Sequence, residues 1–110
     1  MRHNITAVLA ADISTADQLQ KLDLIPGTGS LETRVSDDGE SEQINVSFRM
    51  AQSASRPEIL TRDLRVRVKY LDESSGVQRE IDLGTSDIPV RLQIVETDTR
   101  DISFSYRRKI

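Results

Sequence analysis

Two stretches of strict alternation between apolar and polar residues constrain this chain more than any other feature. In residues 44–50 the apolar side chains lie on one face, and Asn45, Ser47 and Arg49 lie on the other. Residues 64–70 repeat the pattern. Because successive side chains of a strand point to opposite sides, this alternation is typical of β-strands with one buried face. The chain is therefore predicted to be built from strands.

Five weaker segments have the same character and are separated by turn-forming residues. They are residues 5–9, 31–35, 77–83, 90–95 and 102–106. Seven short strands separated by turns predict an all-β, mostly antiparallel fold, either a small sandwich or a barrel. A length of 110 residues fits a single β domain that covers 1–110. The predicted core is Ile44, Val46, Phe48, Leu64, Val66, Val68, Ile81, Leu92, Ile94, Ile102 and Phe104.

One short helix is predicted near residues 15–23. Thr15 and Gln18 have the spacing of a capping box, and Leu19 and Leu22 follow at a helical interval. The segment is only about two turns long, so the helix needs tertiary packing to persist.

The residue types present exclude several chemistries. Cysteine is absent, so no disulfide or thiolate metal site can form. His3, the only histidine, is expected to be an exposed residue at the N-terminus, where it cannot serve as a catalytic base or a metal ligand. The acidic stretches match no calcium-binding loop. We therefore predict that the protein is not an enzyme and takes no cofactor, metal or small-molecule substrate.

The charge and hydropathy of the chain bear on its location and partners. A formal net charge of −3 gives no overall attraction to nucleic acid or to anionic lipid. No long apolar segment follows the charged start, so neither a secretory signal nor a membrane span is expected. We expect a location in a virion or in the cytoplasm, and no membrane partner.

One group of basic residues is the candidate nucleic-acid-binding site: Arg62, Arg65, Arg67 and Lys69. A strand face that carries Arg and Lys can follow the phosphates of a nucleic acid. Arg49 and the basic tail 107–109 could extend the stripe. Readers of single strands also need aromatic side chains for stacking, and outward aromatics are not expected here.

The alternative interpretation is that the basic strand is neutralised within the chain. Pairing it with residues 77–83 so that Val66 lies opposite Ile81 sets Arg67 opposite Glu80. The same register gives the pairs Leu64–Leu83, Arg65–Asp82, Lys69–Gln78 and Tyr70–Val77. We favour this self-paired face over a nucleic-acid surface.

The leading functional hypothesis is a non-enzymatic structural protein, a subunit of a larger repeated assembly. Only 36% of the residues are apolar and 4% are aromatic, so a protomer gains by burying further surface against neighbours. The expected setting is a virion component, such as a bacteriophage capsid, decoration or tail protein. The expected partners are copies of the chain or other assembly subunits.

The C-terminal tail is the predicted assembly contact, through Arg107, Arg108, Lys109 and Ile110. Ile110 continues the apolar phase of the strand 102–106 and could cover a neighbour's apolar edge. Two alternatives stay open. One is a nucleic-acid-binding β module that uses residues 62–69. The other is a small acidic protein inhibitor.

Overall fold

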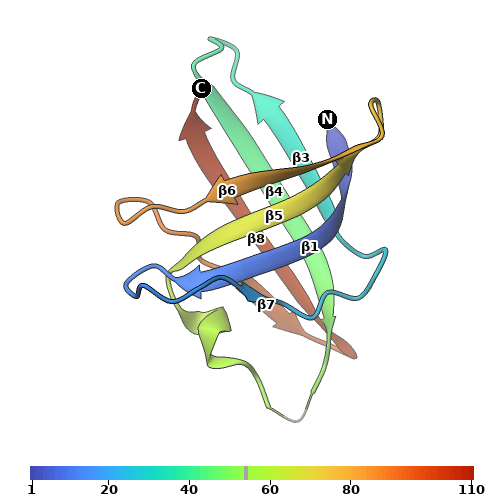
Figure 1. Cartoon of the computed structure of the whole chain (residues 1–110), viewed down its shortest axis with the longest axis vertical. Helices are drawn as coiled ribbons and strands as arrows, with labels where there is room; N and C mark the ends of the chain where they lie inside the picture. Colours follow the sequence, from blue (N-terminus) through green and yellow to red (C-terminus); the bar gives the residue numbers. More distant parts are fainter. Residues whose placement is uncertain (54) are drawn as a thin grey trace.

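The computed structural model describes residues 1–53 and 55–110 and confirms the all-β prediction (Figure 1). The strands are β1 (Arg2–Asp12), β2 (Gln20–Lys21), β3 (Ser30–Val35), β4 (Ser41–Ala51), β5 (Leu64–Asp72), β6 (Val77–Leu83), β7 (Gln93–Glu96) and β8 (Thr99–Lys109). A 3-10 turn, η1, spans Glu58–Thr61. All pairings between strands are antiparallel. In the part of the chain described, no helix is long and apolar enough to cross a membrane.

The strands form one sheet that folds over on itself as a sandwich. The order is β6-β5-β1-β3-β4-β8-β7, with β2 paired to β1. The front layer holds β6, β5 and β1, and it crosses the back layer of β3, β4, β8 and β7 at a steep angle (Figure 1). Each layer buries one face against the other, as the alternation predicts.

Strand β1 pairs with both layers and contains a bulge at Thr6. Residues 2–4 pair with β3, with His3 opposite Leu31. Residues 4–12 pair with β5 on both sides of the bulge, and the register shifts between Ile5 and Ala7. The extra residue also changes which positions point inward, from odd numbers to even ones. A bulge bends a strand and increases its twist, so β1 can turn the corner between the layers.

The core lies between the two inner faces and matches most of the predicted set. Eight predicted core residues are buried: Ile44, Val46, Phe48, Leu64, Val66, Val68, Ile102 and Phe104. Ile81, Leu92 and Ile94 are only partly buried and pack against this core. The lean aromatic content leaves Phe48 as the largest fully buried side chain.

The predicted helix near residues 15–23 is wrong. The segment forms a turn, and then β2 pairs with β1, with Leu9 opposite Lys21. Thr15, the expected helix cap, instead donates a hydrogen bond from its hydroxyl to the carbonyl of Asp12. A helix this short gains little on its own. Pairing with β1 also buries Leu22, whose N–H donates to Val8.

The predicted β5–β6 register is wrong by two positions, although both faces are assigned correctly. Val66 lies opposite Leu83, and Arg67 lies opposite Asp82. The turn explains the difference. Gly76 has a φ of 71°, which suits it to a place inside the turn, so the strands close on the pair Asp72–Val77.

Gly84 provides a test of how the loop after β6 is held. Its φ is 101°, and a Cβ added there would lie 2.4 Å from the carbonyl oxygen of Leu64. Neither backbone can easily move, because Leu64 also exchanges two hydrogen bonds with Val90. We predict that Gly84→Ala lowers the free energy of unfolding by about 1–3 kcal/mol more than the same substitution does at a left-handed glycine in open space.

The matched control is Gly39→Ala. Gly39 also has a positive φ, of 73°, but nothing lies within 4 Å of an added Cβ. This variant carries only the cost of the left-handed backbone, about 1–2 kcal/mol. Urea unfolding of both variants gives the comparison. Equal losses would show that the close approach to Leu64 is not a constraint.

Candidate functional site

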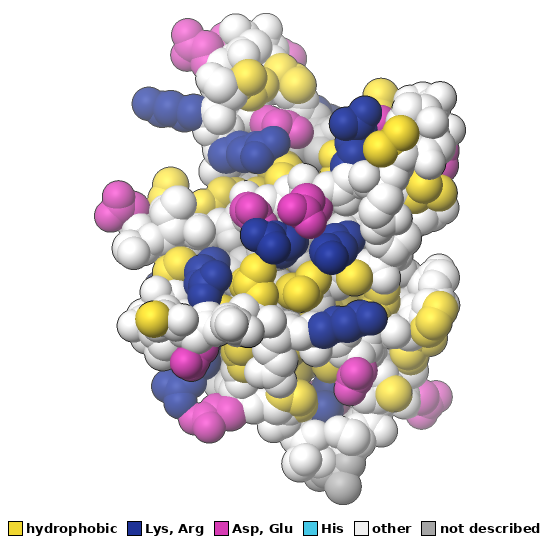
Figure 2. Space-filling view, viewed as in Figure 1, with side chains coloured by type: hydrophobic (Ala, Val, Ile, Leu, Met, Phe, Trp, Pro, Cys, Tyr) yellow, Lys and Arg dark blue, Asp and Glu magenta, His cyan; other side chains and the backbone are white. Residues whose placement is uncertain are grey.

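The predicted basic residues of β5 lie on the outer face of the front layer, beside acidic residues of β6. Figure 2 shows Lys and Arg side chains over β5 with acidic side chains next to them over β6. Arg67 Nε donates to Asp82 Oδ1 at 2.7 Å. That hydrogen bond and the charge of Asp82 raise the pKa of the Arg67 guanidinium. Lys69 lies opposite Glu80 in the register. The cross-strand neutralisation is thus present for Arg67, with a different partner from the predicted one.

The other two predicted residues also have partners within the chain. Arg65 donates to the backbone carbonyl of Asp17. Arg62 forms an ion pair with Glu58 in η1. We call Arg65, Arg67 and Lys69 the β5 row; within the described residues, Arg67 is its one member that forms an ion pair. Whether this face binds nucleic acid remains a prediction.

The expected extension of this stripe by Arg49 and the tail is wrong. Arg49 lies on β4, where it forms an ion pair with Asp101 at 3.2 Å. Residue Arg107 lies on β8. Both strands belong to the back layer, and these two side chains line pockets on its outer face. The layers separate them from the β5 row, so the basic residues form no continuous path.

The tail is held by its own chain. Residues up to Lys109 belong to β8, and Arg108 forms an ion pair with Glu42 at 3.2 Å. The N–H of Ile110 donates to the carbonyl of Glu40 at 3.0 Å. The Ile110 side chain is nevertheless 71% exposed. The tail's backbone is therefore satisfied, and its apolar end is left open to a neighbour.

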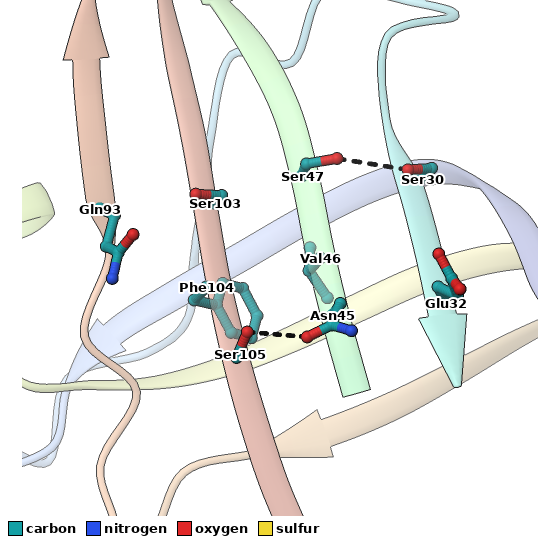
Figure 3. Close-up of a pocket in the computed structure, with 9 residues that line it drawn as sticks. All are labelled: Ser30, Glu32, Asn45, Val46, Ser47, Gln93, Ser103, Phe104 and Ser105. Atoms are coloured by element: carbon teal, nitrogen blue, oxygen red, sulfur yellow. Dashed lines mark hydrogen bonds between the residues drawn. The ribbon is translucent and has the colours of Figure 1, made fainter. Parts of the chain in front are cut away.

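The outer face of the back layer is a trough lined by small polar side chains (Figure 3). Its central hollow, about 220 Å³, is lined by Ser30, Glu32, Asn45, Val46, Ser47, Gln93, Ser103, Phe104 and Ser105. The Oγ atoms of Ser30 and Ser47 lie 3.3 Å apart, and Ser105 donates to Asn45 Oδ1 at 2.7 Å. The lining contains no histidine, and Glu32 is its one carboxylate. The trough offers hydroxyl and amide groups that can form hydrogen bonds.

A second hollow at the end of this face brings two arginines together. Arg34 pairs with Gln43 across β3 and β4, and Gln43 pairs with Arg107 across β4 and β8. The three side chains therefore form a row across neighbouring strands. We call this hollow of about 440 Å³ the arginine groove; it is lined by Arg34, Val35, Ser36, Asp37, Ser41, Gln43 and Arg107.

The prediction that His3 is exposed is wrong. Its side chain points inward, the residue is 8% exposed, and its ring lies 4.9 Å from that of Tyr70. Its Nδ1 is buried without a hydrogen-bond partner. Among residues 1–53 and 55–110, no three His, Asp or Glu side chains are grouped as a metal ion requires.

Two structural features escaped the sequence analysis. Arg100 is buried, with its Nε 3.1 Å from Glu96 Oε1 and its terminal nitrogens 3.4 Å from the carbonyls of Ser53 and Ser55. The arginine groove joins Arg34 to Arg107, which are far apart in the chain. No local pattern signals either feature, since both depend on which strands become neighbours.

Comparisons with known proteins do not assign the chain to a family. No family model, no curated protein and no solved structure matches it.

The acidic turn between β5 and β6 gives a prediction about acid stability. The Asp72 carboxylate accepts hydrogen bonds from Ser74 and Arg79, which lower its pKa from 3.8 to about 2. A carboxyl with a lowered folded-state pKa stabilises the protein fully above its unfolded pKa and loses that effect as the pH falls. We predict that stability declines between about pH 4 and pH 2, and that Asp72→Asn flattens this decline.

The measurement is urea unfolding at several pH values across that window. Glu73→Gln is the control, because it removes a carboxylate from the same turn. It should leave the decline as steep as in the wild-type protein. A decline equally steep in Asp72→Asn would contradict the assignment.

Proposed function

We propose that this protein is a structural subunit of a larger repeated assembly, with no enzymatic activity. The observation that supports this most is the placement of its exposed large apolar residues. Of the six such residues in the described chain, four are Met1, Val35, Val77 and Ile110, which are between 48% and 79% exposed. These four lie on the termini, on the β3–β4 hairpin and on the β5–β6 hairpin, all at one end of the sandwich (Figure 1).

Exposed apolar groups gathered at one end are expected to bind another surface. Hydrophobic side chains are visible over both hairpins in Figure 2, on either side of a notch. Single exposed apolar residues are ordinary on a protein surface, but several at one end of a molecule favour a contact there. In contrast, the trough and the β5 row carry hydrogen-bonding or charged groups. The end of the sandwich that holds both termini, which we call the terminal end, is therefore the best candidate for contact with neighbouring subunits.

Within this class, the setting that we propose is a virus particle, as a capsid, decoration or tail component of a bacteriophage. Small cysteine-free β subunits are common in such particles. A fold alone does not define a role. The proposed setting therefore rests on that general observation and not on the fold.

Light scattering at several protein concentrations tests the proposed function. We predict that the mass rises above the 12.4 kDa of one chain as the concentration increases. Ile110→Asp should weaken the association, because burying an unpaired charge is costly. It should leave thermal unfolding nearly unchanged, since Ile110 is exposed in the protomer.

The matched control is Val95→Asp. Val95 is 59% exposed but lies on β7, away from the terminal end. This variant should associate as the wild-type protein does. A wild-type mass that stays at 12.4 kDa at every concentration would refute the assembly function. Unchanged association in Ile110→Asp would exclude the terminal residue from the contact.

Nucleic-acid binding by the β5 row is the second candidate. The observation in its favour is that Arg65 and Lys69 are half-buried, outward-facing and without an ion pair among the described residues. The observation against it is the bond between Arg67 and Asp82. Removing the Asp82 carboxylate tests whether its bond to Arg67 keeps this face from binding nucleic acid.

We predict that the wild-type protein binds a labelled single-stranded oligonucleotide weakly, and that Asp82→Asn binds it more tightly. The reason is that the substitution releases Arg67 for phosphate contacts. Asp98→Asn, which removes a charge elsewhere, is the control and should show no gain. Tight wild-type binding that weakens steeply between about 50 and 200 mM salt would instead place nucleic-acid binding first.

A further inference from the structure

The arginine groove holds two guanidiniums that form no ion pair. Neither Arg34 nor Arg107 belongs to an ion pair within the described residues, whereas Arg49 on the same face is bound to Asp101. Asp37 is the one carboxylate in the lining, and the charge of Asp38 in the same hairpin also acts on Arg107. The groove is therefore close to neutral overall, but an incoming carboxylate can form the ion pair that these two guanidiniums lack.

The neighbouring acidic residue in the hairpin forms no ion pair with either arginine. Asp38 Oδ1 accepts hydrogen bonds from the hydroxyl of Ser36 and from the N–H of Glu40. That carboxylate is therefore committed to closing the β3–β4 turn. The guanidinium pair stays available, and its planar geometry suits bidentate contacts to a carboxylate.

The groove also has an apolar side. Val35 lines it and is 55% exposed. A partner that fits must therefore present a carboxylate and an apolar side chain next to each other. The volume of about 440 Å³ lies within the range of sites that enclose small ligands, so it can receive two side chains.

The chain itself presents such a pair on the turn 85–88. Ile88 is 55% exposed, and its neighbour Asp87 is also exposed. Of the other exposed large apolar residues, Val95 also has an acidic neighbour in the chain, but Glu96 is bound to Arg100. Asp87 belongs to no ion pair among the described residues. The turn is therefore the matching element.

This turn is held rigidly, which favours binding. The carbonyl of Ile88 accepts hydrogen bonds from the Tyr106 hydroxyl at 2.8 Å and from the Thr85 N–H at 2.9 Å. The Ile88 N–H donates to Thr85 Oγ1 at 3.0 Å. Below the turn, Val90 and Leu64 exchange two hydrogen bonds of 2.8 Å. A turn fixed in this way loses little conformational freedom on docking.

We propose that copies of this chain join head to tail, with the turn 85–88 of one copy seated in the arginine groove of the next. Asp87 binds Arg34 and Arg107 of the second copy, and Ile88 packs on its Val35. The two surfaces are different parts of the chain, so the contact is heterologous. Repeated heterologous contacts build rings or open filaments. This inference rests on the proposed assembly function and names one contact within the assembly.

Reciprocal charge reversal tests the contact. The first variant is Asp87→Arg, and the second is the double change Arg34→Glu with Arg107→Glu. Each alone places like charges across the contact, so each should associate at least about ten-fold more weakly than the wild-type protein. Mixing the two variants restores opposite charges at every junction. The mixture should therefore regain a mass above that of either variant alone, as measured by light scattering.

Controls separate a failed fold from a failed contact. Circular dichroism and thermal unfolding establish that each variant is folded. Asp98→Arg reverses an exposed charge elsewhere and should associate normally. Wild-type association that weakens with added salt is also expected, because the contact is ionic at its centre.

The outcomes distinguish this inference from the function on which it rests. If the wild-type protein remains a monomer, the assembly function fails and the contact fails with it. If the wild-type protein assembles and both charge-reversed variants assemble equally well, the assembly function stands and this contact is overturned. Variants that stay monomeric even when mixed would also overturn the pairing of turn and groove.

Discussion

The bulge at Thr6 is the constraint on which the rest of the structure depends. It lies in β1, which pairs with β3 in the back layer through residues 2–4 and with β5 in the front layer through residues 4–12. A bulge bends and twists its strand, which helps β1 to pass from one layer to the other. The same residue changes the inward-pointing set from His3 and Ile5 to Val8 and Ala10, so both halves of the strand still face the core.

A shared strand also couples the stability of the two layers. The front layer cannot separate from the back layer unless β1 leaves β3 or β5, and each loss exposes part of the core. A second link closes the opposite side of the sandwich. The chain leaves β6 through Gly84 and returns to pair Val90 with Leu64, which brings the loop back onto β5. From Val90 the chain continues to β7 of the back layer, so this loop is a further covalent connection between the layers.

Sequence alone was sufficient for what depends on local alternation. The strands containing Phe48 and Val66 were predicted with the correct buried faces, because a period of two is visible in single segments. The β5–β6 register was not, since Gly76 could be placed in the turn or paired with Leu71 by the pattern alone. The same limit applies to the arginine groove. Arg34 and Arg107 become neighbours only through Gln43 of β4, and that relation requires the strand order.

Strand β6 ends the sheet path, and in the part of the chain described no strand pairs with its outer edge. It carries Gln78, Arg79, Glu80 and Asp82 along seven residues. Charged edge strands discourage the backbone of another molecule from continuing the sheet. Along this edge, growth of a β-ladder from one molecule to the next is disfavoured, so a crowded population of these chains is protected against that route to amyloid-like fibres.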